Sequence, residues 1–140
     1  MDEASALPVE LDETQRQFLR AALLDWGGPA RPTDELAAAM GFGSAMTLSR
    51  EARELWTRIE AGEALTTDDW RRVLLAVEIV FVSDVVGSGL DWRFTSGLSD
   101  EESIRVLRGL QRTLPRWRQS VQFSTKSGSV EVMDPGRRAP

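Results

Sequence analysis

The sequence of 140 residues predicts an all-α fold: a compact bundle of about five helices around a buried central helix at about 67–86. Apolar residues recur at intervals of three and four, as on one face of a helix, through a domain spanning residues 11–118. Residues that cap helices precede these segments. One segment is apolar on nearly all sides, which is typical of a helix surrounded by other helices.

The first helix is expected to run from Asp12 to Asp25, after a flexible lead-in at residues 1–10. Asp12 can cap its N-terminus, and Gln15 follows at the spacing of a capping box. The sequence Gly-Gly-Pro at 27–29 ends it, because proline cannot continue a helix. One apolar stripe is formed by Leu11, Phe18, Leu19, Ala22, Leu23 and Trp26.

Two further helices are expected before residue 62. A short one runs from Thr33 to Met40, with Thr33 as its cap. The next begins at Ala45 or Ser49 and ends at Ala61. Its buried face is expected to carry Leu48, Ala52, Leu55 and Ile59.

The central helix is expected to begin at Thr66 or Thr67 and to reach about Val86. Its β-branched residues would also permit a strand, but its length and its cap favour a helix. Two carboxylates within it, Glu78 and Asp84, lie about 240° apart around the helix axis. They are therefore not expected to form one site, and each should emerge at a helix edge or pair with an Arg.

Residues 87–98, with the sequence GSGLDWRFTSGL, are expected to form a Gly-rich loop. Its apolar side chains, Leu90, Trp92 and Phe94, are predicted to fold back onto the core. An alternative is that Asp91, Trp92 and Arg93 form an exposed anchor for a protein partner, because Trp and Arg are enriched where binding energy concentrates.

The last helix is expected to begin after Ser99, which forms the clearest capping box of the chain with Glu102. Pro115 ends or kinks it. Residues 119–140 are predicted to be an extension that forms either a small β-hairpin or a tail, because apolar and polar residues alternate on both sides of TKSGS. The final residues are expected to be disordered.

The composition excludes much chemistry. The chain has no Cys and no His, and its only Lys is Lys126. Thiolate nucleophiles, Ser-His-Asp triads and imidazole or thiolate metal sites are therefore absent, and we expect a protein that is not an enzyme and needs no cofactor or metal. No apolar run could span a membrane, so a cytoplasmic location is expected. Sixteen Arg against one Lys is typical of a GC-rich bacterial genome.

Charge is unevenly distributed along the chain. Residues 1–70 hold 14 acidic and 6 basic residues, whereas residues 71–140 hold 8 acidic and 11 basic residues. We therefore predict a protein-interaction module, such as an adaptor, a regulator or an immunity-type protein, that acts through its acidic N-terminal half and an Arg-rich helix. That helix carries Arg105, Arg108, Arg112 and Arg116 at helical spacing. The alternative for this row is a solvated face or pairing with the acidic helices.

Residues 35–51 resemble a helix-turn-helix, with a short Ala-rich helix, Gly41 at the turn and a second helix after it. The resemblance implies a DNA-binding transcriptional regulator whose DNA-facing residues would be Ser44, Thr47, Ser49, Arg50 and Arg53. The acidic N-terminal half disfavours nucleic acid as a partner, because binding to DNA depends on phosphate neutralisation. The alternative is an ordinary pair of packed helices.

Overall fold

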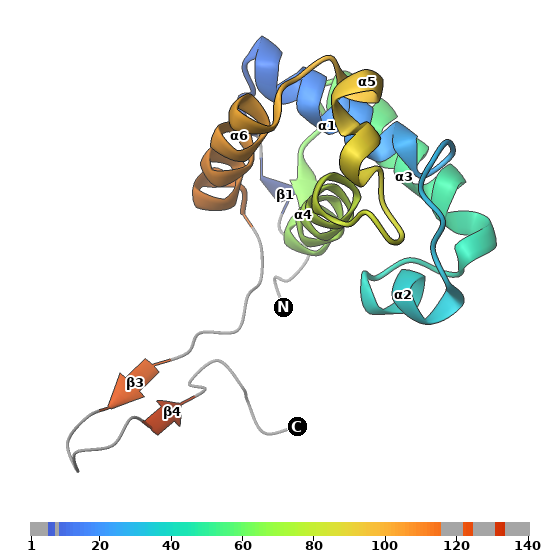
Figure 1. Cartoon of the computed structure of the whole chain (residues 1–140). Coiled ribbons are helices and arrows are strands. Elements are labelled where there is room, and N and C mark those ends of the chain that lie inside the picture. Colours follow the sequence, from blue (N-terminus) through green and yellow to red (C-terminus); the bar gives the residue numbers. More distant parts are fainter. Residues whose placement is uncertain (1–5, 8, 116–121, 125–130, 134–140) are drawn as a thin grey trace.

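The computed structural model describes residues 6–7, 9–115, 122–124 and 131–133, and it confirms the all-α fold (Figure 1). Six α-helices lie in the described part of the chain. They are α1 (Glu13–Asp25), α2 (Asp34–Ala39), α3 (Ala45–Glu60), α4 (Thr67–Val82), α5 (Trp92–Ser96) and α6 (Asp100–Thr113), with a 3-10 turn η2 (Gly89–Asp91) before α5.

The predicted helix starts are confirmed by their caps. Asp12 accepts a hydrogen bond from the Gln15 backbone N–H at 2.7 Å, and the Gln15 side chain accepts one from the Asp12 N–H at 2.9 Å. Ser99 and Glu102 form the same reciprocal box at α6. Each box satisfies backbone donors that no carbonyl of the helix can reach.

Helix α4 is the buried centre of the bundle, as predicted. Figure 1 shows it nearly end-on, with α1, α3, α5 and α6 around it. Every residue from 69 to 81 is buried or half-buried. At its C-terminal end the ring of Phe81 packs edge-on against Phe18 of α1 and Trp92 of α5, with centroids 6.0 and 5.5 Å apart. This aromatic cluster joins three helices that are distant in the sequence.

Helix α4 ends at Val82, four residues before the predicted end. Ser83 adopts an extended conformation, and the chain then folds back over the last turn. There the Gly87 N–H donates to the Ser83 carbonyl, and the Ser88 N–H donates to the Val80 carbonyl at 2.7 Å. The approach is so close that a Cβ on Gly87 would lie 2.5 Å from a carbonyl oxygen of α4. Glycine alone fits at that position.

The segment predicted as a loop at 87–98 contains η2 and α5 instead. Trp92 lies in the core with no exposed surface, as one prediction required. The prediction that Leu90 and Phe94 also pack on the core is wrong, because each is 81% exposed. The physical reason is helical geometry: residues two apart on a helix point in nearly opposite directions, so burying Trp92 turns its neighbours at 90 and 94 outwards.

Two pairs of short strands accompany the helices among the described residues. Residues 1–10 were expected to be a flexible lead-in. Within them, β1 (Ala6–Leu7) instead pairs antiparallel with β2 (Leu65–Thr66), just before α4. In the C-terminal extension, where a small β-hairpin or a tail was expected, β3 (Gln122–Ser124) pairs antiparallel with β4 (Glu131–Met133). The predicted disordered tail lies outside the described residues. No helix in the described part is long and apolar enough to cross a membrane.

Candidate functional site

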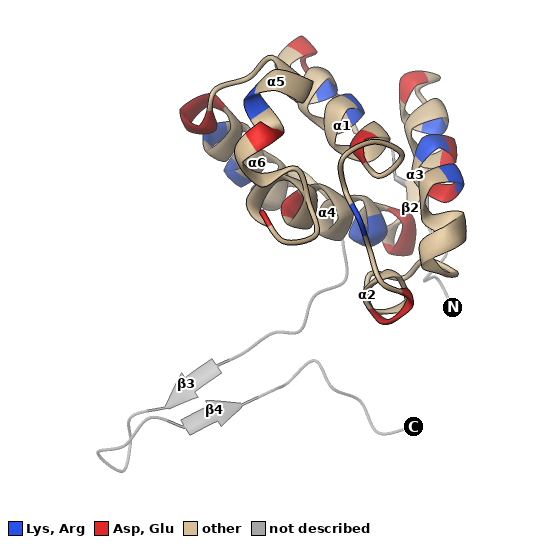
Figure 2. Ribbon diagram, turned by 45° about the vertical axis from the view of Figure 1, so that its right-hand side comes forward, with Lys and Arg blue, Asp and Glu red and all other residues tan. Residues whose placement is uncertain are grey.

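The predicted Arg row lies on the outer face of α6. Arg105, Arg108 and Arg112 are exposed there, among the blue segments of α6 in Figure 2. Arg108 donates a hydrogen bond to the Gln111 side chain at 2.6 Å, and the Gln111 amide in turn donates to Glu78 of α4 at 2.7 Å. Glu78 therefore lies at an edge of the central helix, as expected. Arg116 lies outside the described residues.

The structure separates the predicted anchor Asp91, Trp92 and Arg93. The interpretation of Trp92 as an exposed anchor is wrong, because its ring is fully buried against Phe18 and Phe81. Its indole N–H donates to the hydroxyl of Ser103 at 2.7 Å, which satisfies its only polar group. Asp91 and Arg93 remain exposed on either side of it.

Two of the residues predicted to face DNA, Ser44 and Thr47, instead cap the N-terminus of α3. The Thr47 N–H donates to Ser44, and the Ser44 N–H donates to Thr47 in a reciprocal box. The Thr47 hydroxyl also donates to Glu51 at 2.6 Å, and Glu51 accepts a hydrogen bond from the Gly43 N–H at 3.0 Å. Ser49 is half-buried. These groups hold the turn between α2 and α3 in place.

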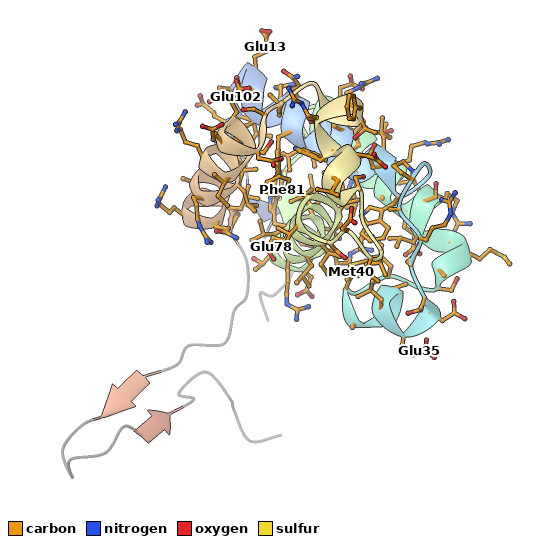
Figure 3. All side chains as sticks on the ribbon, viewed as in Figure 1. Glu13, Glu35, Met40, Glu78, Phe81 and Glu102 are labelled. Atoms are coloured by element: carbon orange, nitrogen blue, oxygen red, sulfur yellow. The ribbon has the colours of Figure 1, made fainter. Side chains whose placement is uncertain are left out.

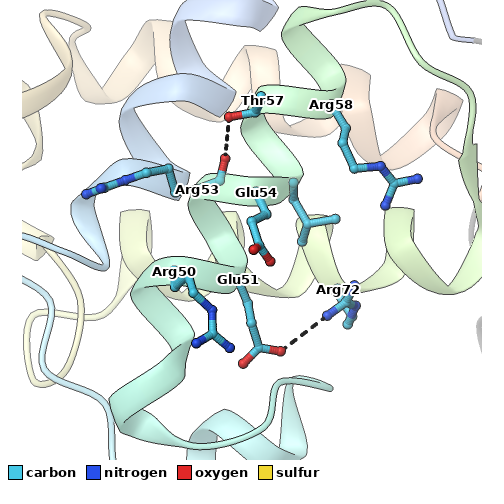
Figure 4. Close-up of a pocket in the computed structure, with 8 residues that line it drawn as sticks. Arg50, Glu51, Arg53, Glu54, Thr57, Arg58 and Arg72 are labelled. Atoms are coloured by element: carbon cyan, nitrogen blue, oxygen red, sulfur yellow. Dashed lines mark hydrogen bonds and ion pairs between the residues drawn. The ribbon is translucent and has the colours of Figure 1, made fainter.

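Arg50 and Arg53 line a depression of about 560 Å³ on α3, together with Glu54 (Figure 4). Arg72 of α4 reaches its edge and pairs with Glu51 at 3.7 Å. The depression is therefore lined by charges of both signs. Four Arg and two Glu side chains make up the charged part of this lining, and Asp69 offsets two of the Arg through its ion pairs with Arg58 and Arg72.

Asp69 joins α3 to α4 below this depression. It accepts hydrogen bonds from Arg72 at 2.7 Å and from Arg58 at 3.0 Å, and its side chain is 16% exposed. Burial acts to raise the pKa of Asp69, but the two guanidinium groups outweigh burial and lower this pKa below its usual value of 3.8. A hydrogen bond to Glu63, against the cost of burial, raises the pKa of Arg58. The cluster is structural, since it ties two helices together.

A different surface carries the exposed apolar side chains. The described residues include six large hydrophobic side chains that are exposed, and five of them lie between residues 82 and 104. They are Val82 (67%), Val85 (90%), Leu90 (81%), Phe94 (81%) and Ile104 (40%). Scattered apolar residues on a surface are ordinary, but a group gathered on one segment is typical of an interaction site.

Three of these side chains line a groove of about 410 Å³ between the end of α4, η2 and the start of α6. Val82, Leu90 and Ile104 form its apolar walls together with Phe81. The ring of Phe81, labelled in Figure 3, belongs to the aromatic cluster of the core. The groove, called the apolar groove below, therefore adjoins the aromatic cluster of the core.

Carboxylates complete the apolar groove. Asp84, Asp100 and Glu101 line it, and of the described residues that line it none is Lys or Arg. Asp84 accepts a hydrogen bond from the Leu90 N–H at 2.9 Å, which fixes the turn that presents Leu90. Asp100 and Glu101 occupy the first turn of α6, where the helix dipole stabilises negative charge. The groove thus combines an apolar floor with an acidic edge.

The segment that forms the apolar groove is fastened to α1 by the buried carboxylate of Asp25, which is 8% exposed. One of its oxygens accepts hydrogen bonds from the hydroxyls of Ser88 and Thr95, both at 2.7 Å. Ser88 and Thr95 flank η2 and most of α5, so Asp25 fixes the position of Leu90 and Phe94 between them. The role of Asp25 is not visible in the sequence, because its partners lie 63 and 70 residues away.

The apolar groove was not predicted from the sequence. The described residues predicted to bind a partner or DNA do not line it, and several of them, such as Trp92 and Ser44, stabilise the fold. Within the described residues, no group of three or more Asp or Glu side chains is placed to hold a metal ion. Comparison of the chain with protein-family models, with curated proteins and with solved structures finds no match.

Proposed function

We propose that this protein is a non-enzymatic protein-interaction module that holds its partner in the apolar groove. The observation that carries the proposal is the exposure of Val82, Leu90 and Ile104 around one groove. Exposed apolar area is unfavourable in water, and a partner that covers it gains roughly 25 cal/mol for each Å² removed from water. The absence of His and Cys from the sequence supports binding over catalysis.

The proposal moves the interaction surface from the predicted Arg row to the groove. It keeps the expectation of an acidic binding face, now formed by Asp84 in the turn after α4 and by Asp100 and Glu101 of α6 instead of the N-terminal half. The DNA-binding alternative gains no specific support, because Ser44 and Thr47 cap α3 and the depression at Arg50 and Arg53 carries both signs of charge.

The test is affinity capture from cells that produce the protein, using the full chain and two variants. Leu90→Gln with Val82→Gln removes apolar surface from the lining of the groove without entering the core, since both side chains are exposed. Met46→Gln is the matched control, because Met46 is 90% exposed at the start of α3. We expect a protein that is retained by wild type and by the control and is lost with the double variant. Retention that is equal for all three chains contradicts the proposal.

A further inference from the structure

We infer that the occupant of the apolar groove is a basic amphipathic helix of a partner protein, an inference that rests on the proposed function. The shape of the groove is the first argument. Its walls come from two helices, α4 and α6, with η2 beside them. A third helix fits such a space by packing its ridges between them, and its apolar residues at intervals of three and four would meet Val82, Leu90 and Ile104.

Charge complementarity is the second argument, and it selects a basic partner. Three carboxylates line the groove and no base does so among the described residues. The bases that stand nearest in the chain, Arg93 and Arg105, are not part of the lining. Lys or Arg side chains flanking the apolar face of an incoming helix would therefore meet Asp84, Asp100 and Glu101, whereas an acidic helix would be repelled.

The same charges argue against two other occupants. An anionic membrane surface would be repelled by the carboxylates that border the apolar floor. A second copy of this chain would bring its own three carboxylates to the contact if it used the same surface, as a two-fold dimer requires. A basic helix from a different protein meets neither obstacle.

Synthetic peptides of about 14 residues, or four helical turns, test the inference on the full chain. The first peptide contains Leu on one face and Lys on the other. The second replaces every Lys by Glu, and the third keeps the Leu and Lys composition but spreads Leu around the helix. We expect the first peptide to bind at least about tenfold more tightly than either of the others at physiological salt. Equal binding of the first and third peptides overturns the inference.

Variants of the protein separate the groove from general attraction between a basic peptide and an acidic chain. Asp84→Asn, Asp100→Asn and Glu101→Gln together remove the acidic edge, and Asn at 84 keeps an oxygen acceptor for the Leu90 N–H. We expect this triple variant to bind the first peptide about tenfold more weakly. The matched control removes three exposed carboxylates from helices that do not line the groove, through Glu35→Gln on α2 and Glu54→Gln and Glu60→Gln on α3, and should change binding less than about twofold, because salt screens distant charges.

Each outcome has a defined meaning. Equal loss of binding in the two triple variants overturns the inference, as does wild-type binding that does not weaken with rising salt, a measurement that needs no variant. A dimer in sedimentation equilibrium that Leu90→Gln dissociates also overturns it. If the capture experiment finds a groove-dependent partner but the Leu and Lys peptide does not bind, the inference fails while the proposed function stands. If neither is found, both fail.

Discussion

Replacing Asp25 by Ala is expected to destabilise the protein and to loosen the segment that carries Leu90 and Phe94. The carboxylate accepts hydrogen bonds from Ser88 and Thr95 at 2.7 Å each. Hydrogen bonds to a charged group contribute about 1.5–3 kcal/mol each, and a buried hydroxyl left without a partner costs about 1–3 kcal/mol. Ser88 is 2% exposed, so water cannot replace its lost partner.

Thr95 lies at the surface and its hydroxyl also donates to the Trp92 carbonyl at 3.3 Å, so its contribution is smaller. The variant also escapes the cost of burying a carboxylate. Together these effects predict a loss of about 2–3 kcal/mol in the free energy of unfolding. For a domain of this size, that loss lowers Tm by roughly 7–13 °C.

Urea unfolding measures the loss, and a double-mutant cycle with Ser88→Ala isolates the contact. We expect a coupling of about 1–2 kcal/mol between positions 25 and 88. Hydrogen exchange should accelerate at the Ser88 amide, whose bond to the Val80 carbonyl belongs to the same turn. Asp91→Ala is the control, because Asp91 is exposed and its loss should cost less than about 0.5 kcal/mol. A cost for Asp25→Ala as small as that of the control, or zero coupling, would refute the reasoning.

Three further predictions concern stability. Trp92→Phe should cost about 1–2 kcal/mol more than Trp70→Phe in urea unfolding, because the Trp92 indole N–H is hydrogen-bonded while that of Trp70, which is equally buried, has no partner among the described residues; equal costs would contradict this. Asp69→Asn should lower the free energy of unfolding by about 1–2 kcal/mol at neutral pH. Because the folded-state pKa of Asp69 lies below 3.8, the extra free energy of unfolding of the wild type should be complete above about pH 4 and vanish as the pH falls through that lowered pKa. Urea unfolding at several pH values measures this difference. A difference that does not depend on pH would be evidence against the ion cluster. Gly109→Ala should stabilise the protein by about 0.5–1 kcal/mol, since a Cβ there meets open space on α6, whereas Gly87→Ala should destabilise it by at least about 2 kcal/mol through its clash with α4; thermal melting with the opposite order would overturn this assignment.

The helix starts could be predicted from the sequence because their determinants are local. A capping box needs residues three positions apart, and both members at Asp12–Gln15 and Ser99–Glu102 are visible in the chain. Thr66 caps α4 at one of the two predicted starts, but the Asp69 side chain, three residues later, forms no reciprocal hydrogen bond with it, because it binds Arg58 of α3 and Arg72 instead. A tertiary ion cluster outcompeted the local motif there.

The candidate site could not be predicted because it depends on which face of a short helix turns inwards. Apolar residues in an expected loop are by default assigned to the core, and Leu90 and Phe94 were therefore predicted to be buried together with Trp92. A helical interpretation of residues 89–96 would have separated them. Trp92 and Ser96, four apart, then share one face, and Leu90 and Phe94 share the opposite face.

Polar side chains accompany Trp92 on the buried face of the segment from η2 to α6. Three serines of this region, Ser88, Ser96 and Ser103, are at most 7% exposed, and each hydroxyl has a buried hydrogen-bond partner. Leu90 and Phe94, in the same segment, are exposed to solvent. This arrangement inverts the usual placement of apolar and polar residues, so it lowers stability relative to a chain with the two kinds exchanged. Sequences depart from local consistency mainly at functional sites. A partner that covered the groove would recover part of this cost, and we therefore propose the function there and not on the Arg row.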